Sequence, residues 1–438
     1  MSCSSRILET EILDMKKIIG CILKCLLCWA AVLAVCFGLL CAAAAVPDGR
    51  LEKNLISSAD KMAARPPHEH LQKSFYSSVC DNYADAVLLG VAANMSSDDL
   101  PRSALDTRYY DDGFGPAVGI KATVDGKPAN IDYTRYWHGS LVFVRPLLAV
   151  ADISGIRLVG SVVIALLFAA DAVYLLYKKQ KAACVIFLVS AVLVSFWYVF
   201  TTLEYMSVFI IMLAALPLFV KYADNSRALT LISVGTGTLT AFADFLTAET
   251  LTILVPLVMA FFVRAGRGEK PDKKDSLVTA LSCMAGWGVA YLATFAAKWV
   301  LASAALGRDV SSDAVAAAEL RVNGMEEEFS SPIEMMFSAL GANLSMLAPT
   351  DQKVSAVWIL IWLAAFTAVC VMISLSGTRR HNLPKAVMIV IALIPIIRFC
   401  LLMNHSYLHN FFTYRALMPS IMAVLGLVWY RVGTAKKK

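Results

Sequence analysis

The chain has 438 residues, of which 58% are hydrophobic and only 16% are charged, and its formal net charge is +6. Soluble domains are about 45–50% apolar and about 25% charged, so this composition excludes an ordinary soluble protein. It indicates an all-α polytopic membrane protein with about ten transmembrane helices.

The N-terminal section, residues 1–46, is predicted to hold a short cytoplasmic segment and the first transmembrane helix. Its apolar run, from about residue 18, is too long for the hydrophobic region of a signal peptide. Residues 47–155 follow as a mixed polar segment, predicted to be an extracytoplasmic loop. Near the end of this loop Arg145 and Pro146 interrupt an apolar stretch, which predicts an interfacial helix rather than a span.

The remaining spans are predicted in two groups that a second polar loop, residues 306–352, separates. Residues 156–305 contain transmembrane helices 2–7, and residues 353–438 contain helices 8–10 and a cytoplasmic C-terminus. The individual spans are expected at about 156–177, 183–202, 205–220, 228–247, 250–263, 276–297, 354–374, 386–403 and 411–430.

Lysine and arginine residues gather in alternate connections between these spans. The clusters lie near residues 16–24, 178–181, 221–227, 264–274, 379–385 and 436–438. Because cytoplasmic loops carry an excess of Lys and Arg, both termini are predicted to be cytoplasmic and both long loops to face outward. The expected location is therefore the cell membrane, with several passes through it.

The first long loop contains the acidic motif Asp81-Asn82-Tyr83-Ala84-Asp85, followed by apolar residues. On a helix the two aspartates are four residues apart and share a face. A carboxylate pair held at a membrane surface suits removal of a proton from a hydroxyl group. The alternative interpretation is a solvated helix face.

Further polar residues collect at the predicted outer ends of the spans, where charges are costly and are candidates for function. They are Arg135, His138, Asp244, Glu249, Lys298, Arg398, His405, His409 and Arg415. Each also has an ordinary alternative, such as a helix cap for Asp244 or a side chain that reaches the interface for Lys298. The sequence has no Walker loop, no dinucleotide-binding motif and no zinc-protease or serine-hydrolase motif.

An outward-facing enzyme has no nucleotide sugar available, so its activated donor must arrive in the membrane. A polyprenyl-phosphate sugar meets this need, with a carboxylate to take the proton of the acceptor and cations to stabilise the departing phosphate. We expect that phosphate to meet Arg398, Arg415, Lys298 and Arg135.

A first transmembrane helix followed by a long outer loop with an early acidic motif resembles the GT-C class of integral-membrane glycosyltransferases. The stretches 81–85, 135–139, 244–247 and 409–415 also look like those of bacterial multi-pass proteins associated with this class. The resemblance implies that Asp81 is the catalytic base, with Asp85 as a second candidate. Expected substrate contacts are Asn82, Tyr136, Trp137, His138, Asp244, Glu249, His405 and His409.

The resemblance also implies a bacterial plasma membrane location and an extracytoplasmic glycan, lipid or protein as the acceptor. The second acidic motif of the class has no clear match in this chain. A carboxylate pair can hold Mg²⁺ or Mn²⁺, but many members of the class work without a metal, so the sequence leaves the cofactor open. Two other classes stay open as well: a transporter or flippase for a lipid-linked sugar, and a non-catalytic membrane scaffold.

Overall fold

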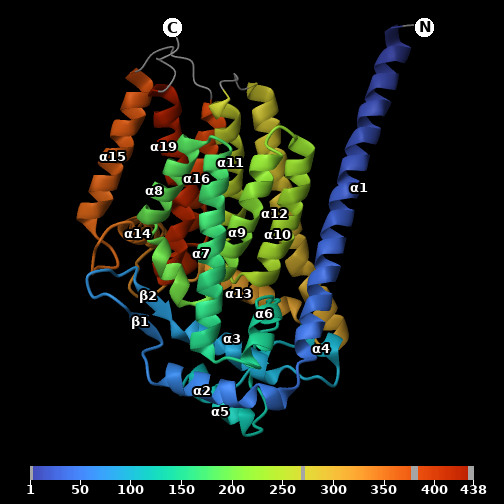
Figure 1. The fold of residues 1–438 in the computed structure, drawn as a ribbon, viewed down its shortest axis with the longest axis vertical. Coiled ribbons are helices and arrows are strands. Elements are labelled where there is room, and N and C mark those ends of the chain that lie inside the picture. The colour runs from blue at the N-terminus through green and yellow to red at the C-terminus, as the bar shows by residue number, and fades with distance from the viewer. Residues whose placement is uncertain (1–2, 268–271, 376–382, 433–438) are drawn as a thin grey trace.

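The structure, a computed structural model, describes residues 3–267, 272–375 and 383–432. It is mostly helical, with a body of long helices and a layer of short helices and strands at one end (Figure 1). This architecture confirms the expected class of a mostly helical membrane protein.

Five segments within the described residues are long and apolar enough to cross a membrane. They are Ile18–Ala44 of α1 (Cys3–Ala44), α7 (Ile153–Tyr177), α9 (Leu203–Lys221), α12 (Lys273–Leu306) and Asn410–Tyr430, which contains most of α19 (Met418–Val432). The other predicted spans also fall on helices, namely α8 (Lys181–Leu193), α10 (Ser226–Ala243), α11 (Leu251–Gly266), α15 (Ala356–Leu375) and α16 (Lys385–Leu401). The complete set of ten spans stays a prediction.

Close packing in the body depends on small and polar side chains at helix contacts. A Cβ atom at Gly237 of α10 would lie 2.3 Å from the carbonyl oxygen of Trp287 on α12, so only glycine permits this approach. The indole Nε1 of Trp287 donates to the Thr252 hydroxyl at 2.9 Å, and the Thr252 and Thr240 hydroxyl oxygens are 2.8 Å apart. These contacts join α10, α11 and α12 within the body.

The first long loop folds into a compact layer at the end of the body opposite the start of α1 (Figure 1). We call this layer, residues 47–152, the loop layer. Its helices are η1 (Asp48–Arg50), α2 (Glu52–Ala63), α3 (Asn82–Asn94), α4 (Leu100–Leu105), α5 (Pro116–Val124) and α6 (Leu141–Leu148). Its two antiparallel strand pairs are β1 (His68–His70) with β2 (Val79–Asp81), and β3 (Arg108–Tyr109) with β4 (Ile131–Asp132).

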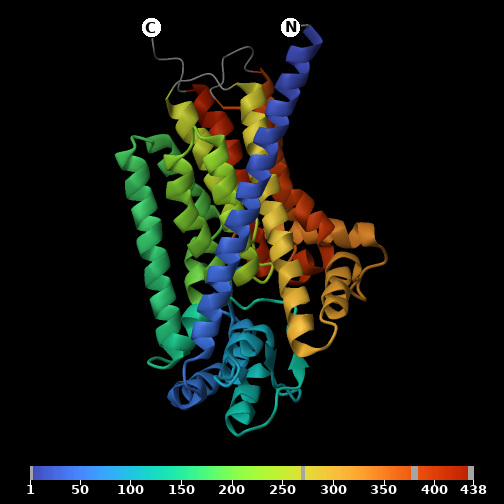
Figure 2. The same ribbon diagram turned by 90° about the vertical axis from the view of Figure 1, so that its right-hand side faces the viewer.

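The second long loop forms α13 (Ser311–Asn323) and α14 (Pro332–Ser345). These helices, orange in Figure 2, lie beside the lower ends of the long helices, next to the loop layer. The remaining short elements are η2 (Phe196–Thr201), α17 (Met403–Leu408), α18 (Asn410–Thr413) and η3 (Tyr414–Leu417). Both loops therefore contribute to the same end of the molecule.

Arg145 fastens the loop layer to the body, and its side chain is fully buried. Its guanidinium donates to the carbonyl oxygens of Ala43 at 3.1 Å, Val46 at 3.0 Å and Ala92, and it forms an ion pair with Asp48. Ala43 lies in the last turn of α1, Val46 and Asp48 follow that helix, and Ala92 lies in α3. The Arg145 side chain therefore joins α1, α3 and α6. The predicted helix around Arg145 is present as α6.

The sidedness of the molecule is testable with two exposed lysines, Lys127 after α5 and Lys178 after α7. Each is replaced by cysteine in a variant that lacks the native cysteines, and intact cells are treated with a membrane-impermeant maleimide. Since the loop layer is predicted to face outward, Lys127→Cys should react and Lys178→Cys should react only after lysis. The opposite labelling pattern would overturn the predicted orientation.

Candidate active site

A cavity of about 310 Å³ lies where the loop layer, the N-terminal end of α9 and the second loop meet. Its wall is unusually rich in groups that titrate or carry charge. These groups are His68, Asp81, Arg135, His138, Glu204, Arg321, His405 and His409, with Tyr83, Tyr109, Tyr133, Phe245 and Phe412 as the main aromatic lining. Residues from widely separated parts of the sequence therefore form one polar site.

Asp81 ends β2 and caps the N-terminus of α3, and the residue is only 4% exposed. Its Oδ1 accepts from the backbone N–H of Ala84 at 2.9 Å and lies 3.7 Å from Nε2 of His68. Burial raises the pKa of Asp81 to about 6, although His68 and the bond from Ala84 act in the opposite direction. A carboxylate with this pKa is ionised at neutral pH and is basic enough to take a proton.

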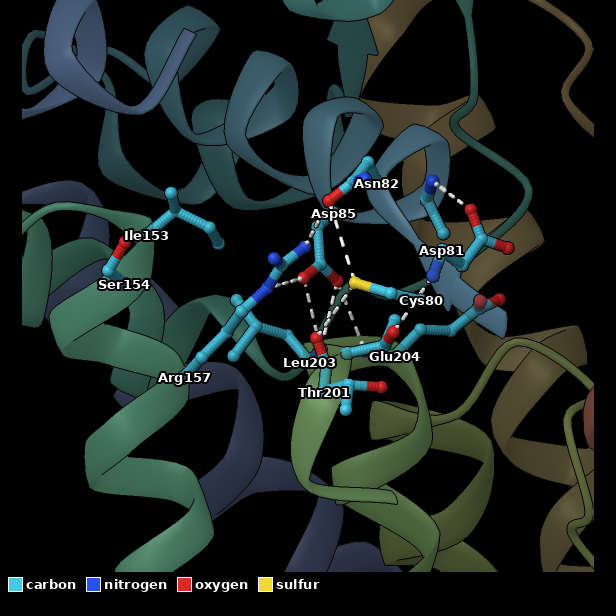
Figure 3. Close-up of polar contacts among 12 residues, drawn as sticks. Cys80, Asp81, Asn82, Asp85, Ile153, Ser154, Arg157, Thr201, Leu203 and Glu204 are labelled. Carbon is cyan, nitrogen blue, oxygen red and sulfur yellow. Dashed lines mark hydrogen bonds and ion pairs between the residues drawn. The ribbon is translucent and has the colours of Figure 1, made fainter. Parts of the chain in front are cut away.

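Asp85 occupies a different environment from Asp81, and the two side chains do not share a helix face because Asp81 precedes the helix. The fully buried Asp85 carboxylate accepts from Nε of Arg157 at 2.8 Å and from the backbone N–H groups of Leu203 at 2.9 Å and Glu204 at 3.4 Å. Figure 3 shows Asp85 between Arg157 and the start of α9, with Asp81 on the other side of Cys80. Asp85 therefore holds α7, α3 and α9 together.

Glu204 is the second carboxylate of the cavity, and sequence reasoning missed it. It stands in the first turn of α9, and its side chain extends toward the side of Asp81 in Figure 3. Its Oε2 is buried and has no hydrogen-bond partner among the described residues. Glu204 lies at the outer end of a predicted span, which is the same signal that singled out the other charged candidates.

Asn82 points away from the cavity. Its Nδ2 donates to the carbonyl oxygen of Pro66 at 3.0 Å, and its Oδ1 accepts from Arg157 at 3.0 Å. The structure therefore gives Asn82 a role in packing the acidic motif rather than a place in the cavity wall.

Arg398 has a carboxylate partner that the sequence did not indicate. Its Nε and Nη2 bind the two carboxylate oxygens of Glu249 at 2.6 and 2.8 Å, and both side chains are buried. Nη2 also donates to the carbonyl oxygen of Leu246 at 2.8 Å, a residue held in the left-handed region at φ 65°. The two charges neutralise each other, so the assignment of Arg398 to the phosphate and of Glu249 to the substrate loses its basis.

Asp244 closes the turn between α10 and α11. Its carboxylate accepts from the backbone N–H of Thr247 at 3.1 Å and from the Thr247 hydroxyl. Asp244 does not line the cavity, but the turn that it stabilises places Phe245 in the wall.

Lys298 and Arg415 are both buried and lie outside the cavity wall. Nζ of Lys298 donates to the carbonyl oxygens of Leu105 at 2.8 Å and Ala104 at 3.4 Å, which closes the C-terminus of α4. Arg415 donates to the carbonyl oxygen of Phe411 at 3.1 Å, and its Nε and Nη2 have no partner among the described residues. Of the four cations predicted to meet a phosphate, Arg135 lines the cavity.

The guanidinium of Arg135 lies 4.5 Å from the ring centroid of Tyr133 and 3.2 Å from the carboxylate of Asp313 on α13. Tyr136 and Trp137, the two aromatic residues that follow Arg135, are buried in the protein interior. Trp137 is fully buried and donates from Nε1 to the carbonyl oxygen of Thr294 at 2.8 Å. Tyr136 is also buried and packs behind the wall, so neither lines the cavity as expected for a substrate contact.

His138, His405 and His409 all line the cavity, as does His68, which the sequence did not single out. His138 adopts a left-handed backbone conformation at φ 54°, and its Nε2 is 3.3 Å from the carbonyl oxygen of Tyr133. Burial lowers the pKa of His138 to about 3, so its ring is neutral at physiological pH. A neutral ring in this position is a hydrogen-bonding group rather than a cation.

Within the described residues no three His, Cys, Asp or Glu side chains come together as ligands for a metal ion, and we assign no metal-binding residues. No protein family model matches the chain, and no significant match is found among curated proteins or solved structures.

Proposed function

We propose that this protein is a membrane glycosyltransferase that moves a sugar from a polyprenyl-phosphate donor to an extracytoplasmic acceptor, which is a glycan, a lipid or a protein. The observation that carries the proposal is the position of Asp81, a buried carboxylate in the wall of a cavity that also contains two arginines. Such a site supplies a base and compensating positive charge side by side.

In the proposed reaction Asp81 accepts the proton of an acceptor hydroxyl. The oxygen of that hydroxyl forms a bond to the anomeric carbon of the sugar while the bond from this carbon to the phosphate oxygen breaks. The phosphate leaves with the electron pair of the broken bond, and Arg135 stabilises the charge on it. Glu204 faces the same cavity and offers a hydrogen-bond acceptor to the sugar or the acceptor.

A transporter for a lipid-linked sugar is less well supported. Transporters carry their substrate sites near the bilayer midplane, between gated halves. Here the charged residues gather at the end of the helical body that adjoins the loop layer, and the predicted topology places that end at the outer surface.

The proposal is tested by turnover in proteoliposomes that contain a radiolabelled polyprenyl-phosphate sugar, with mannose, glucose and galactose compared. A crude cell-envelope fraction is the acceptor, and liposomes without protein are the control. We expect protein-dependent release of polyprenyl phosphate and movement of the label into the acceptor fraction. Delivery of the intact sugar donor across the bilayer, without cleavage, would contradict the proposal and favour a transporter.

A further inference from the structure

Arg321, near the C-terminus of α13, reaches from the second loop into the cavity. Its Nη1 lies 3.2 Å from Nε2 of His409 and 3.5 Å from Nδ1 of His405. Within the part of the chain that the structure describes, these two ring nitrogens are its hydrogen-bond partners. The other edge of the guanidinium, formed by Nε and Nη2, makes no hydrogen bond there.

Both histidines are neutral acceptors toward Arg321. Nε2 of His405 is 2.8 Å from the carbonyl oxygen of Leu246, so this nitrogen carries the proton and Nδ1 presents its lone pair to the guanidinium. Nε2 of His409 accepts from Arg321, which places the proton of that ring on Nδ1. Burial lowers the pKa of His409 to about 3 and that of His405 well below its usual range, with the Arg321 charge acting in the same direction.

Arg321 differs from three other arginines in having no carboxylate partner among the described residues. Arg157 and Arg398 each pair with a buried carboxylate, and Arg135 makes a single contact with the exposed carboxylate of Asp313, whereas Arg321 forms no ion pair with any described residue. Glu204 also lines the cavity and its charge attracts Arg321 through space, but the two side chains form no ion pair among the described residues. The histidines hold the guanidinium in place without cancelling its charge, so that charge is available to a ligand.

We propose that Arg321, positioned by His405 and His409, forms a subsite for a phosphoryl anion in this cavity. The free Nε–Nη2 edge matches two oxygens of a phosphate, a geometry that guanidinium groups bind in a bidentate manner. This inference deepens the proposed function, on which it rests for the identity of the ligand as the phosphate of the sugar donor. Its test measures binding alone and does not require transfer.

The decisive comparison is between His409→Glu and His409→Gln in the full-length purified protein. Both replacements offer an oxygen to Arg321, but only glutamate brings a negative charge that neutralises it. Binding of polyprenyl phosphate, polyprenol and inorganic phosphate is measured for each by native mass spectrometry and by thermophoresis. We expect His409→Gln to keep most of the preference for polyprenyl phosphate over polyprenol, and His409→Glu to bind polyprenyl phosphate at least about tenfold more weakly, on the order of 1.4 kcal/mol.

Two further variants complete the design. Arg321→Gln should lose the preference for the phosphorylated lipid, whereas Arg102→Gln, which removes an exposed arginine of α4, should not. Competition by inorganic phosphate would support a subsite for free phosphoryl anions, and its absence would support a subsite for the lipid-linked group. Equal binding by the two His409 variants, or equal binding of polyprenol and polyprenyl phosphate by the wild type, would overturn the inference.

The binding result separates this inference from the proposed function. If the two His409 variants differ as expected while no polyprenyl-phosphate sugar is consumed, the subsite stands and glycosyl transfer fails. If sugar donors are consumed at equal rates and bound equally by both variants, transfer stands and the phosphate must be held elsewhere.

Discussion

Replacement of Asp81 by asparagine should reduce turnover of the sugar donor by about 10²–10⁴-fold, the usual contribution of a general base. Asparagine has the same size but cannot accept the proton. It is also a good N-cap residue, so it keeps the hydrogen bond from the Ala84 N–H that starts α3. The measurement is the initial rate of polyprenyl-phosphate release in proteoliposomes, with the thermal unfolding temperature as the check on folding.

The pH dependence of the wild-type rate provides the control for this variant. A base acts only in its deprotonated form, so a pKa of about 6 predicts that kcat/KM rises with pH through about 6 and then levels off. The residual rate of Asp81→Asn should not show this rise. An Asp81→Asn protein with the rate and pH profile of the wild type would remove Asp81 from the mechanism.

Asp85→Asn should instead destabilise the fold, by about 3–5 kcal/mol, the range typical of a buried ion pair that loses one partner. The asparagine amide cannot receive the N–H groups of Arg157, Leu203 and Glu204 together, and its own NH₂ group would face these donors. The measurement is the thermal unfolding temperature in detergent, followed by intrinsic tryptophan fluorescence.

Asp81→Asn is the matched control for Asp85→Asn, because both change one carboxylate of the same motif to the same amide. The first should unfold near the wild-type temperature and the second well below it. Replacing Arg157 by glutamine in the Asp85→Asn protein should recover part of the loss, since the unpaired charge is then removed. Equal stability of the two single variants would show that the Asp85–Arg157 pair does not stabilise the protein.

The helices of the body were predictable from apolar runs, because a span requires a long stretch without charge. The prediction of a span at about 156–177 corresponds to α7, Ile153–Tyr177. The helix begins earlier because Asp152 accepts hydrogen bonds from the N–H groups of Ser154 and Gly155 and caps it. The internal order of the loop layer was not predictable, since its short helices lack a clear period.

The site was predictable only in part. Asp81, Arg135, His138, His405 and His409 line one cavity, but their common location comes from tertiary packing and not from spacing along the chain.

The partners of buried charges were equally hidden from sequence reasoning. Glu249 and Arg398 are 149 positions apart, and no local pattern indicates that they form an ion pair. Arg321 lies in a polar loop, where an arginine is ordinary, so only its position beside two neutral histidines makes it a candidate.

A density map of the Asp81→Asn protein, determined by electron cryomicroscopy with a polyprenyl-phosphate sugar bound, tests the central claim most directly. This variant should bind the sugar donor but not consume it. We predict that the sugar occupies the cavity beside residue 81 and that the phosphate lies toward Arg135 and Arg321. A sugar donor bound at the opposite end of the helices, or a cavity that excludes it at saturating concentration, would contradict the account.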